Sequence, residues 1–448
     1  MRYLFLLFII LFTSTTYAQT DQKIYDIIAA VSEGNLRKDV QTLVNFGTRH
    51  TLSDTISETR GIGAARRWIK SEFETISKDC DDCLEVFYQK DFVKKGENQR
   101  IVKDVMVVNV VAIQKGTKYP NRFIIMSGDI DSRVTGSNDF TSDAPGANDN
   151  ATGMAGALET ARVLSKYQFE NSIIYVGLSG EEQGLFGGKG LAKYAKDNNW
   201  DIIGVLNNDM IGNITGVDGV IDNRTFRIFS EPITTSITDP EKLASQTTAR
   251  RFYGGEVDGI SRQLARYIYK TTKTYMPEMN PMMVYRLDRF GRGGHHKPFN
   301  DAGFAGIRIM EAHENYTQQH QDIRTENGID YGDTFEHVNF PYCKKLTTVN
   351  AITMANLASA PPSPTEVSIG GIVEASVKLK WSKVEGAKGY KIYWRDTTSS
   401  TWDHSRYIED INEFTLEGIV IDNFYFGVAA VGANGHESVV VFPNKILR

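Results

Sequence analysis

Two adjacent glutamates, Glu181 and Glu182, stand between an apolar segment and a glycine-rich one in "IIYVGLSGEEQGLFGG". Other carboxylates also follow apolar segments: Asp129 and Asp131 come after "RFIIMSG", and Asp209 comes after "DIIGVLNN". Carboxylates that crowd together repel and raise one another's pKa unless a cation lies between them. If the apolar segments are neighbouring strands, the pattern predicts a metal site. Oxygen ligands combined with imidazole suit Zn²⁺.

Two polar segments offer further ligands. Asp149 lies in "PGANDNATG", a turn before a predicted helix, and His313 and His320 lie in "AHENYTQQHQD". Each acid alone has another explanation, because Asp is common in turns and helix caps, and the helix dipole favours Glu182 at a helix start. Five acids at corresponding positions nevertheless favour a shared site. A pair of metal ions bridged by a carboxylate is a known hydrolytic device.

The segments that carry these residues alternate between strand and helix patterns. Apolar runs predict the strands, and apolar residues at helical spacing predict the helices. Predicted strands cover residues 122–128, 171–180, 201–210 and 305–310, and helical patterns cover residues 24–78, 153–167, 183–198 and 259–275. The alternation predicts an α/β fold with parallel strands and helices on both faces of one sheet. The carboxyl ends of such strands meet at one edge, where ligands bind.

The composition changes near residue 360. Three prolines within residues 360–364 prevent continuation of a helix and predict an interdomain linker. Residues 365–448 show short alternating strand patterns separated by turn residues. They predict a small all-β sandwich domain. With Trp381 on an early strand and the aromatic segment "FYFGVAAVG" later, it resembles a fibronectin type III domain.

Charge excludes one class of partner. The 448 residues include 50 basic and 55 acidic side chains, giving a formal net charge of -5. Because the basic residues are dispersed and outnumbered, the chain lacks the electrostatic footprint of a nucleic-acid-binding protein. We therefore expect no nucleic-acid partner.

The N-terminus predicts export. Residues 1–18 combine one arginine, an apolar stretch and a polar end, as in a cleaved secretory signal peptide. The apolar stretch is shorter than the roughly 20 residues needed to span a bilayer, although a retained anchor is the alternative. We expect a secreted or periplasmic protein, beginning near residue 19, without stable membrane insertion after cleavage.

The three cysteines allow one local pair. Cys80 and Cys83 in "DCDDCLE" can bond to each other in an oxidising compartment, which leaves Cys343 free. A redox-active pair is the alternative, but the flanking aspartates disfavour a thiolate. The pattern favours a disulfide that closes a loop.

Five motifs together resemble peptidase family M28, a family of zinc peptidases that are mostly aminopeptidases. They are "DID", "PGANDNATG", "SGEEQGLFG", "NNDM" and the "HHKPF" to "NYTQQHQD" region, and the resemblance covers roughly residues 25 to 358. The resemblance implies a peptidase domain over residues 19–359. It also implies a three-layer sandwich with a mixed, largely parallel central sheet, followed by the small C-terminal β-sandwich.

The resemblance also implies a role for each matching residue. Asp149 corresponds to a carboxylate that bridges two metal ions, Glu182 and His320 to ligands of one ion, and Asp209 to a ligand of the other. Glu181 corresponds to the general base. One glutamate would thus hold the metal while its neighbour takes a proton from the attacking water.

This chain departs from the family at one position. Where the family has His-x-Asp, with the His as a ligand and the Asp orienting its ring, this chain has Asp129 and Asp131. A second site made of Asp129, Asp149 and Asp209 has only oxygen ligands, which favours harder ions or weaker zinc binding. We therefore expect one tightly bound Zn²⁺ and a second, weaker or exchangeable divalent site. Asp131 stays in the predicted catalytic group.

Other residues are candidates for substrate contact. His296 matches a family histidine near the reacting carbonyl, and Tyr285 lies in a Met-, Tyr- and Arg-rich segment that could form a pocket wall or simply pack in the core. His313 is the alternative to His320 as a ligand.

These features predict an exported metal-dependent exopeptidase, an aminopeptidase acting on peptide substrates. One alternative is a single-zinc aminoacyltransferase similar to glutaminyl cyclases, which resemble the same scaffold. Another is a peptidase-like binding protein that has lost activity. The C-terminal domain is expected to be a spacer or to dock a protein or polysaccharide.

Overall fold

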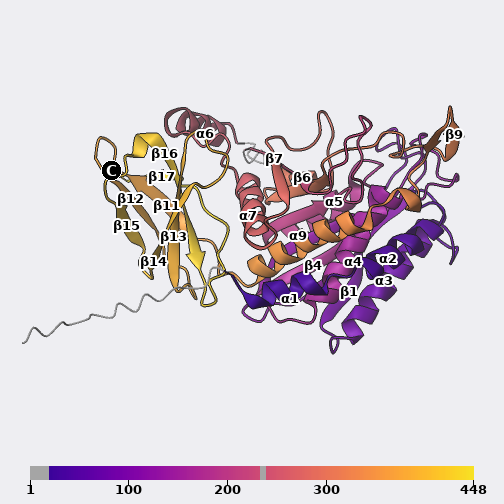
Figure 1. Cartoon of the computed structure of the whole chain (residues 1–448), viewed down its shortest axis with the longest axis horizontal. Coiled ribbons are helices and arrows are strands. Elements are labelled where there is room, and N and C mark those ends of the chain that lie inside the picture. The colour runs from indigo at the N-terminus through magenta and orange to yellow at the C-terminus, as the bar shows by residue number, and fades with distance from the viewer. Residues whose placement is uncertain (1–19, 233–238, 448) are drawn as a thin grey trace, which may run out of the picture.

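The computed structural model describes residues 20–232 and 239–447. The predicted signal peptide, residues 1–18, lies outside the described residues. Figure 1 shows a larger part, with helices packed on a sheet, beside a smaller part made of strands. Among the described residues, no helix combines the length and hydropathy needed to cross a membrane.

An eight-stranded mixed sheet runs through the larger part, in the order β1-β2-β4-β3-β5-β8-β6-β7. Its strands are β1 (Leu84–Val93), β2 (Val105–Gln114), β3 (Tyr119–Asp129), β4 (Asn171–Leu178), β5 (Asp201–Asn208), β6 (Thr225–Ser230), β7 (Asn280–Val284) and β8 (Gly306–Glu311). The four central strands are parallel to one another. β1 and β2 pair antiparallel at one side, and β6 runs antiparallel to β8 at the other. The predicted mixed, largely parallel sheet is confirmed.

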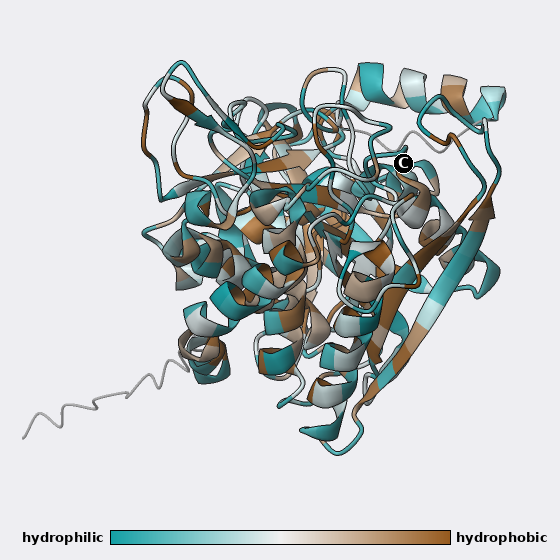
Figure 2. Cartoon of the chain, turned by 90° about the vertical axis from the view of Figure 1, so that its right-hand side faces the viewer, coloured by the Kyte–Doolittle hydropathy of each residue, from teal (hydrophilic) through white to brown (hydrophobic). Residues whose placement is uncertain are grey.

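Helices cover both faces of this sheet. They are α1 (Gln22–Ala30), α2 (Glu33–Asn45), α3 (Gly61–Lys78), α4 (Gly153–Leu164), α5 (Phe186–Asp197), α7 (Ile260–Tyr275), α8 (His296–Asp301) and α9 (Phe340–Ala358). A further helix, α6 (Pro240–Tyr253), has no buried residue and contributes to neither core of the sheet. Side chains alternate along β3, so that Ile124 and Met126 join the core under α1–α4, α7 and α9, whereas Ile125 joins the core under α5 and α8. Figure 2 shows the same division by hydropathy, with brown strands inside and teal positions on the outer sides of the helices.

Local signals explain several helix starts. The side chain of Ser32 accepts a hydrogen bond from the backbone N–H of Asn35 at the start of α2, and Asn339 accepts one from Tyr342 at the start of α9. The helical pattern over residues 24–78 is broken into α1, α2 and α3. The turn after α3 is closed by a disulfide between Cys80 and Cys83, and Cys343 is free and buried.

The smaller part consists of two sheets that enclose their own apolar core around Trp381 and Tyr390. Its strands are β11 (Thr365–Gly370), β12 (Val377–Ser382), β13 (Gly389–Asp396), β14 (His404–Glu409), β15 (Glu413–Leu416), β16 (Phe424–Val431) and β17 (Lys445–Ile446). The order is β15-β12-β11-β17 in one sheet and β14-β13-β16 in the other. A further short hairpin, β9 (Arg324–Glu326) with β10 (Ile329–Tyr331), projects from the larger part.

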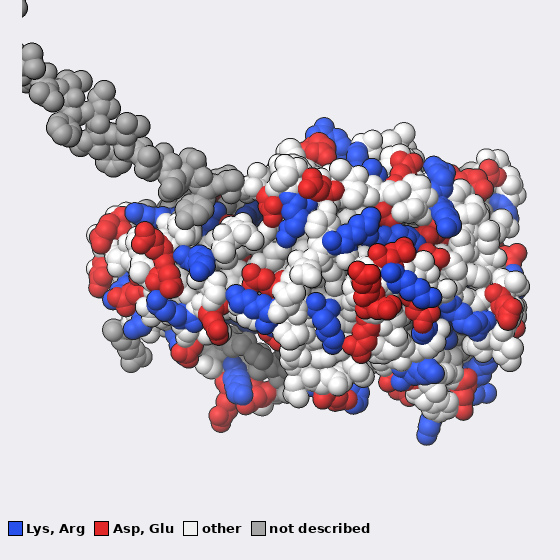
Figure 3. Space-filling model, turned by 90° about the horizontal axis from the view of Figure 1, so that it is seen from below, with Lys and Arg blue, Asp and Glu red and all other residues white. Residues whose placement is uncertain are grey.

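Buried ion pairs join the two parts. Asp258, just before α7, accepts hydrogen bonds from Arg266 on α7 and from Arg395 on β13, and all three side chains are buried. Nearby, Lys270 of α7 pairs with Glu437 of the smaller part. The C-terminal sheets are therefore held against α7 by charge as well as by packing. On the face seen in Figure 3, basic and acidic side chains are interspersed.

We expect Asp258→Asn to lower the free energy of unfolding by about 3–5 kcal/mol, because it leaves two buried guanidinium groups without their carboxylate. Urea unfolding would measure the change. The matched control is Asp410→Asn, whose partner Lys383 and whose own side chain are more than half exposed. It should change the free energy of unfolding by less than about 1 kcal/mol. Equal changes in the two variants would contradict a role for this buried network.

Candidate metal centre

The predicted site residues gather at the carboxyl edge of the central sheet. Three neighbouring parallel strands end there, and each is followed by acids. The positions are Asp129 at the end of β3 and Asp131 just after it, Glu181 and Glu182 after β4, Asp209 after β5, Asp149 in the turn Ala147–Thr152 before α4, and His320 in the loop after β8.

Three of these residues form one ligand cluster. Nε2 of His320 lies 2.9 Å from Oδ2 of Asp149 and 2.6 Å from Oε1 of Glu182. One ligand atom from each residue lies within 4.8 Å of the others, and among the described residues no other such group of His, Cys, Asp or Glu side chains is found. Both carboxylates face the same ring nitrogen, so a cation between the three replaces their repulsion with attraction.

The turn that carries Asp149 is fixed by a second acid, Asp333. Its carboxylate accepts hydrogen bonds from the backbone N–H groups of Asn148 at 2.8 Å and Asp149 at 2.7 Å. Gln319 donates to Oδ2 of Asp149 at 2.9 Å. Burial raises the pKa of Asp333 to about 7. These contacts hold the Asp149 carboxylate toward His320.

The turn that carries the two glutamates is fixed by Asp131. Its carboxylate accepts hydrogen bonds from the backbone N–H groups of Glu181 at 3.2 Å and Glu182 at 3.0 Å. The side chain of Glu182 is directed at His320, whereas that of Glu181 makes no hydrogen bond or ion pair with the described residues. Burial and the neighbouring Glu182 carboxylate hold the pKa of Glu181 well above its ordinary range. A carboxylate with a raised pKa suits proton transfer near neutral pH.

Arg133 orients two of the ligands. Its Nε donates to Oε2 of Glu182 at 2.6 Å, and its Nη2 lies 2.7 Å from Nδ1 of His320. Since a guanidinium can only donate, Nδ1 accepts and Nε2 is left to face the carboxylates. Such outer partners fix the ring orientation of a metal-binding histidine.

The cluster opens into a pocket of about 290 Å³, which is lined by Asp149, Glu181, Glu182, Asp209 and His320 among others. The side chain of Glu181 is half-buried, so it is accessible from this pocket. A substrate bound there therefore meets the ligand cluster and a free carboxylate together.

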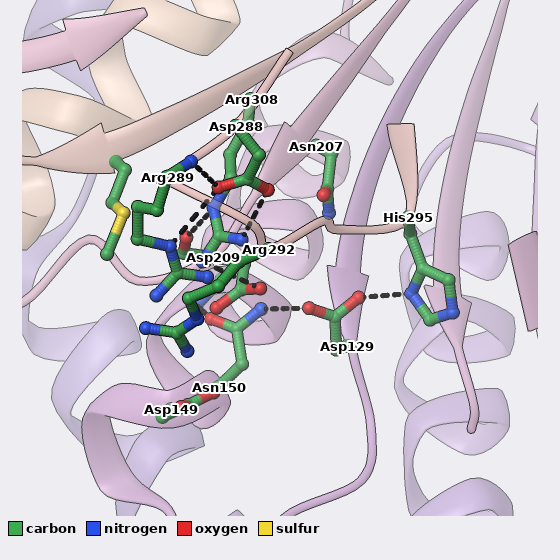
Figure 4. Close-up of polar contacts among 12 residues, drawn as sticks. Asp129, Asp149, Asn150, Asn207, Asp209, Asp288, Arg289, Arg292, His295 and Arg308 are labelled. Atoms are coloured by element: carbon green, nitrogen blue, oxygen red, sulfur yellow. Dashed lines mark hydrogen bonds and ion pairs between the residues drawn. The ribbon is translucent and has the colours of Figure 1, made fainter. Parts of the chain in front are cut away.

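Asp129 is engaged elsewhere, as Figure 4 shows. Its Oδ1 lies 2.5 Å from Nδ1 of His295, and its Oδ2 accepts a hydrogen bond from Asn150 at 2.8 Å. Both carboxylate oxygens thus have a protein partner, and the side chain is buried.

Asp209 has a cationic partner, Arg308 of β8. Nη2 of Arg308 lies 3.0 Å from Oδ2 of Asp209, and its Nη1 donates to Asp288 at 2.9 Å. Arg308 is fully buried, and its guanidinium keeps its charge at any ordinary pH. Oδ1 of Asp209 is buried and has no hydrogen-bond partner among the described residues. A fixed positive charge therefore stands beside the predicted ligand (Figure 4).

Comparison with known proteins identifies the family. The sequence profile of peptidase family M28 matches residues 109–340. A probable zinc metalloprotease of Pyrenophora tritici-repentis is 36% identical over 428 residues, which cover 94% of this chain and 98% of that protein. One of Leptosphaeria maculans is 40% identical over 427 residues, covering 94% of this chain and 97% of that protein. The chain belongs to peptidase family M28.

Solved structures share the fold of this M28 peptidase. The LapA aminopeptidase of Legionella pneumophila superposes with a TM-score of 0.55 at 16% identity, covering 81% of each chain. The glutaminyl cyclase of Macrostomum lignano has a TM-score of 0.52 at 12% identity, covering 76% of this chain and 94% of the cyclase. Both likenesses show the architecture.

The relatives are named probable zinc metalloproteases, and the ligand cluster fits zinc. Asp149, Glu182 and His320 supply two carboxylates and one imidazole, and three protein ligands with an open fourth position are typical of catalytic zinc. This chain is thus a zinc metallopeptidase, and these three residues have the types and spacing to hold a metal ion.

The residues present do not fit a second ion in the same way. Among the described side chains, Asp129 and Asp209 do not join Asp149 in another ligand cluster. The physical reason is the set of partners described above: Asp129 is held by His295, and Asp209 by the Arg308 guanidinium.

The predicted substrate residues, His296 and Tyr285, do not line this pocket. His296 is fully buried and its Nε2 lies 2.8 Å from the backbone oxygen of Leu287, while burial lowers its pKa to about 4. Tyr285 donates to the backbone oxygen of Ser400 in the smaller part, and Arg262 lies over its ring. The segment around Tyr285 instead contacts the smaller part of the chain.

Sequence reasoning missed several residues that shape the site. Arg133, Asp288, Arg308 and Asp333 were not assigned, although a charge inside the apolar segment "AGIRIM" was a visible signal for Arg308. Asp333 carried no signal, because its partners are backbone groups 185 and 184 residues earlier in the sequence.

Proposed function

We propose that this M28 metallopeptidase is an exported exopeptidase, an aminopeptidase that removes N-terminal residues from peptides with one tightly held Zn²⁺. The observation that carries the proposal is the pairing of the ligand cluster with Glu181, whose free carboxylate opens on the same pocket. The signal-like sequence of residues 1–18 supports a secreted or periplasmic location.

The chemistry divides between the ion and the chain. A zinc ion held by Asp149, Glu182 and His320 would supply a Lewis acid and lower the pKa of a water molecule beside it. Glu181 would take the proton of the attacking water and return it to the leaving amine. Asp131 keeps Glu181 in place through its backbone N–H, and Arg133 keeps Glu182 and His320 aligned.

One ion is proposed because a guanidinium already neutralises Asp209, one of the acids of the second position. Arg308 lies between Asp209 and Asp288, so a divalent ion at Asp209 would meet a fixed like charge. The fibronectin type III-like character of residues 365–448, and its use as a spacer or docking module, remain part of the proposal.

Glutaminyl cyclase activity is the second candidate, because the single ligand cluster and Glu181 suit either acyl transfer to water or cyclisation of an N-terminal Gln.

A substrate panel with elemental analysis tests the proposal. We expect the purified protein to contain about one zinc per chain and to release amino acids from aminoacyl peptides. We also expect a chelator to abolish release and added zinc to restore it. Cyclisation of N-terminal Gln without aminoacyl release would favour the second candidate. Two tightly held ions per chain would contradict the part assigned to Arg308.

A further inference from the structure

The pocket over the metal cluster is lined by four arginines: Arg100, Arg133, Arg289 and Arg292. We call this set the arginine rim. The rim residues come from three separate loops: Arg100 between β1 and β2, Arg133 after β3, and the other two between β7 and α8. Loops that are distant in sequence thus place guanidinium groups around one opening.

The positive charge of the rim is only partly compensated. The Glu314 carboxylate forms ion pairs with three guanidinium groups. The N···O distances are 3.1 Å to Arg227, 2.9 Å to Arg289 and 3.3 Å to Arg292. Arg289 also contacts Asp288, but that carboxylate is shared with Arg308.

The other two rim members add to this excess. Arg100 donates to the backbone oxygen of Glu182, and no carboxylate partner is found for it among the described residues. Arg133 contacts the Glu182 carboxylate, whose charge is needed by the metal ion. With zinc bound, the pocket therefore has a surplus of guanidinium groups.

The acidic side chains that line the pocket, in contrast, already have a partner or a proposed role. Asp149 and Glu182 are metal ligands, Asp209 is paired with Arg308, and Glu181 is the proposed base. A substrate group that carries negative charge finds several donors in the rim. Guanidinium groups bind carboxylates through charge-assisted hydrogen bonds, often in pairs.

We propose that the arginine rim binds a carboxylate of the substrate close to the scissile bond. Two sources share this chemistry: the side chain of an N-terminal acidic residue, and the terminal carboxylate of a di- or tripeptide, which lies near the scissile bond because the peptide is short. The inference rests on the proposed function and narrows it to acidic or very short peptides.

Four tripeptides separate the two sources. Asp-Ala-Ala and Asn-Ala-Ala form one pair, which differs in the charge of the first side chain. Ala-Ala-Ala and its C-terminal amide form the other pair, which differs in the charge of the C-terminus. We expect removal of the charge to lower kcat/KM by about 10- to 100-fold in at least one pair, the effect of one lost charge-assisted hydrogen bond.

Arg292→Gln provides the matched variant. Arg292 is the rim member with the most exposed side chain, 36%, and it makes one 3.3 Å ion pair, so its loss should leave the fold intact. We expect the discrimination within the sensitive pair to shrink by up to about tenfold in this variant. Arg286→Gln is the control, since Arg286 lies exposed on the same loop but does not line the pocket. It should discriminate like the native chain.

A binding measurement keeps this test independent of turnover. Calorimetric titration of the four tripeptides into the zinc-loaded Glu181→Gln variant should show the same preference for the charged peptide. Carboxylate-dependent binding without cleavage in the native chain would overturn the proposed function and support the rim. Cleavage with equal kcat/KM in both pairs would overturn the rim alone, as would an equal response of Arg292→Gln and Arg286→Gln. Absence of binding by all four peptides would also overturn it.

Discussion

Replacing Glu181 by Gln should lower kcat by about 10²- to 10⁴-fold while the zinc content stays unchanged. Gln has nearly the same size as Glu but cannot accept the proton of the attacking water. The metal should remain, because Asp149, Glu182 and His320 are untouched and the backbone N–H of residue 181 can still donate to Asp131. Steady-state kinetics on an aminoacyl peptide, with elemental analysis of the same preparation, would measure both quantities.

The matched control is Glu97→Gln, which makes the same chemical change at an exposed position on the β1–β2 loop. It should leave kcat within about twofold of the native value, because surface substitutions away from a site are near neutral. If Glu181→Gln retained most of the native kcat, the proton would have to be accepted elsewhere. If it lost zinc together with activity, Glu181 would belong to the ligand set instead.

The sequence predicted the location of the site because that location follows from local patterns. Apolar runs marked β3, β4 and β5, and the acids that follow them had to meet at one edge once the strands were parallel. The different roles of Glu181 and Glu182 also follow from their adjacency, because neighbouring residues in a turn direct their side chains differently.

The residues around the site could not be predicted in the same way, because their partners are distant in sequence. Arg308 meets Asp209 across 99 residues, and His320 meets Arg133 across 187. A departure from the family pattern at Asp129 was visible, but its consequence depended on His295, which the fold places 2.5 Å away. Periodicity and turn chemistry carry no information about such pairs.

The prediction of the strands was limited in the same way, because pairing between distant segments leaves no local pattern. The alternating pattern gave the central parallel strands, but the flanking strands β1, β2, β6 and β7 were not assigned. β2 is apolar and almost continuously buried, so its type was readable, whereas its antiparallel pairing with β4 depends on topology. The contact between Asp258 and Arg395 likewise had no sequence signal, since it joins the two parts of the chain.

Replacing His320 by Ala should release the zinc ion and reduce turnover to background. His320 is the single nitrogen ligand of the cluster, and without it two carboxylates face each other with an incomplete coordination shell. Loss of an outer partner typically costs 10- to 100-fold in metal affinity, so loss of a direct ligand should cost more than about 100-fold. Competition with a zinc chelator would measure the affinity, and peptide hydrolysis the activity.

His313→Ala is the control that the sequence itself suggests, since both histidines stand in the same loop. The backbone oxygen of His313 accepts a hydrogen bond from Asn213, and its side chain is not part of the ligand cluster. This variant should keep its zinc and its activity. The opposite result, with zinc lost in His313→Ala and retained in His320→Ala, would transfer the ligand role to His313. That result would also require a different arrangement of this loop, because Nε2 of His320 lies within 2.9 Å of both carboxylates.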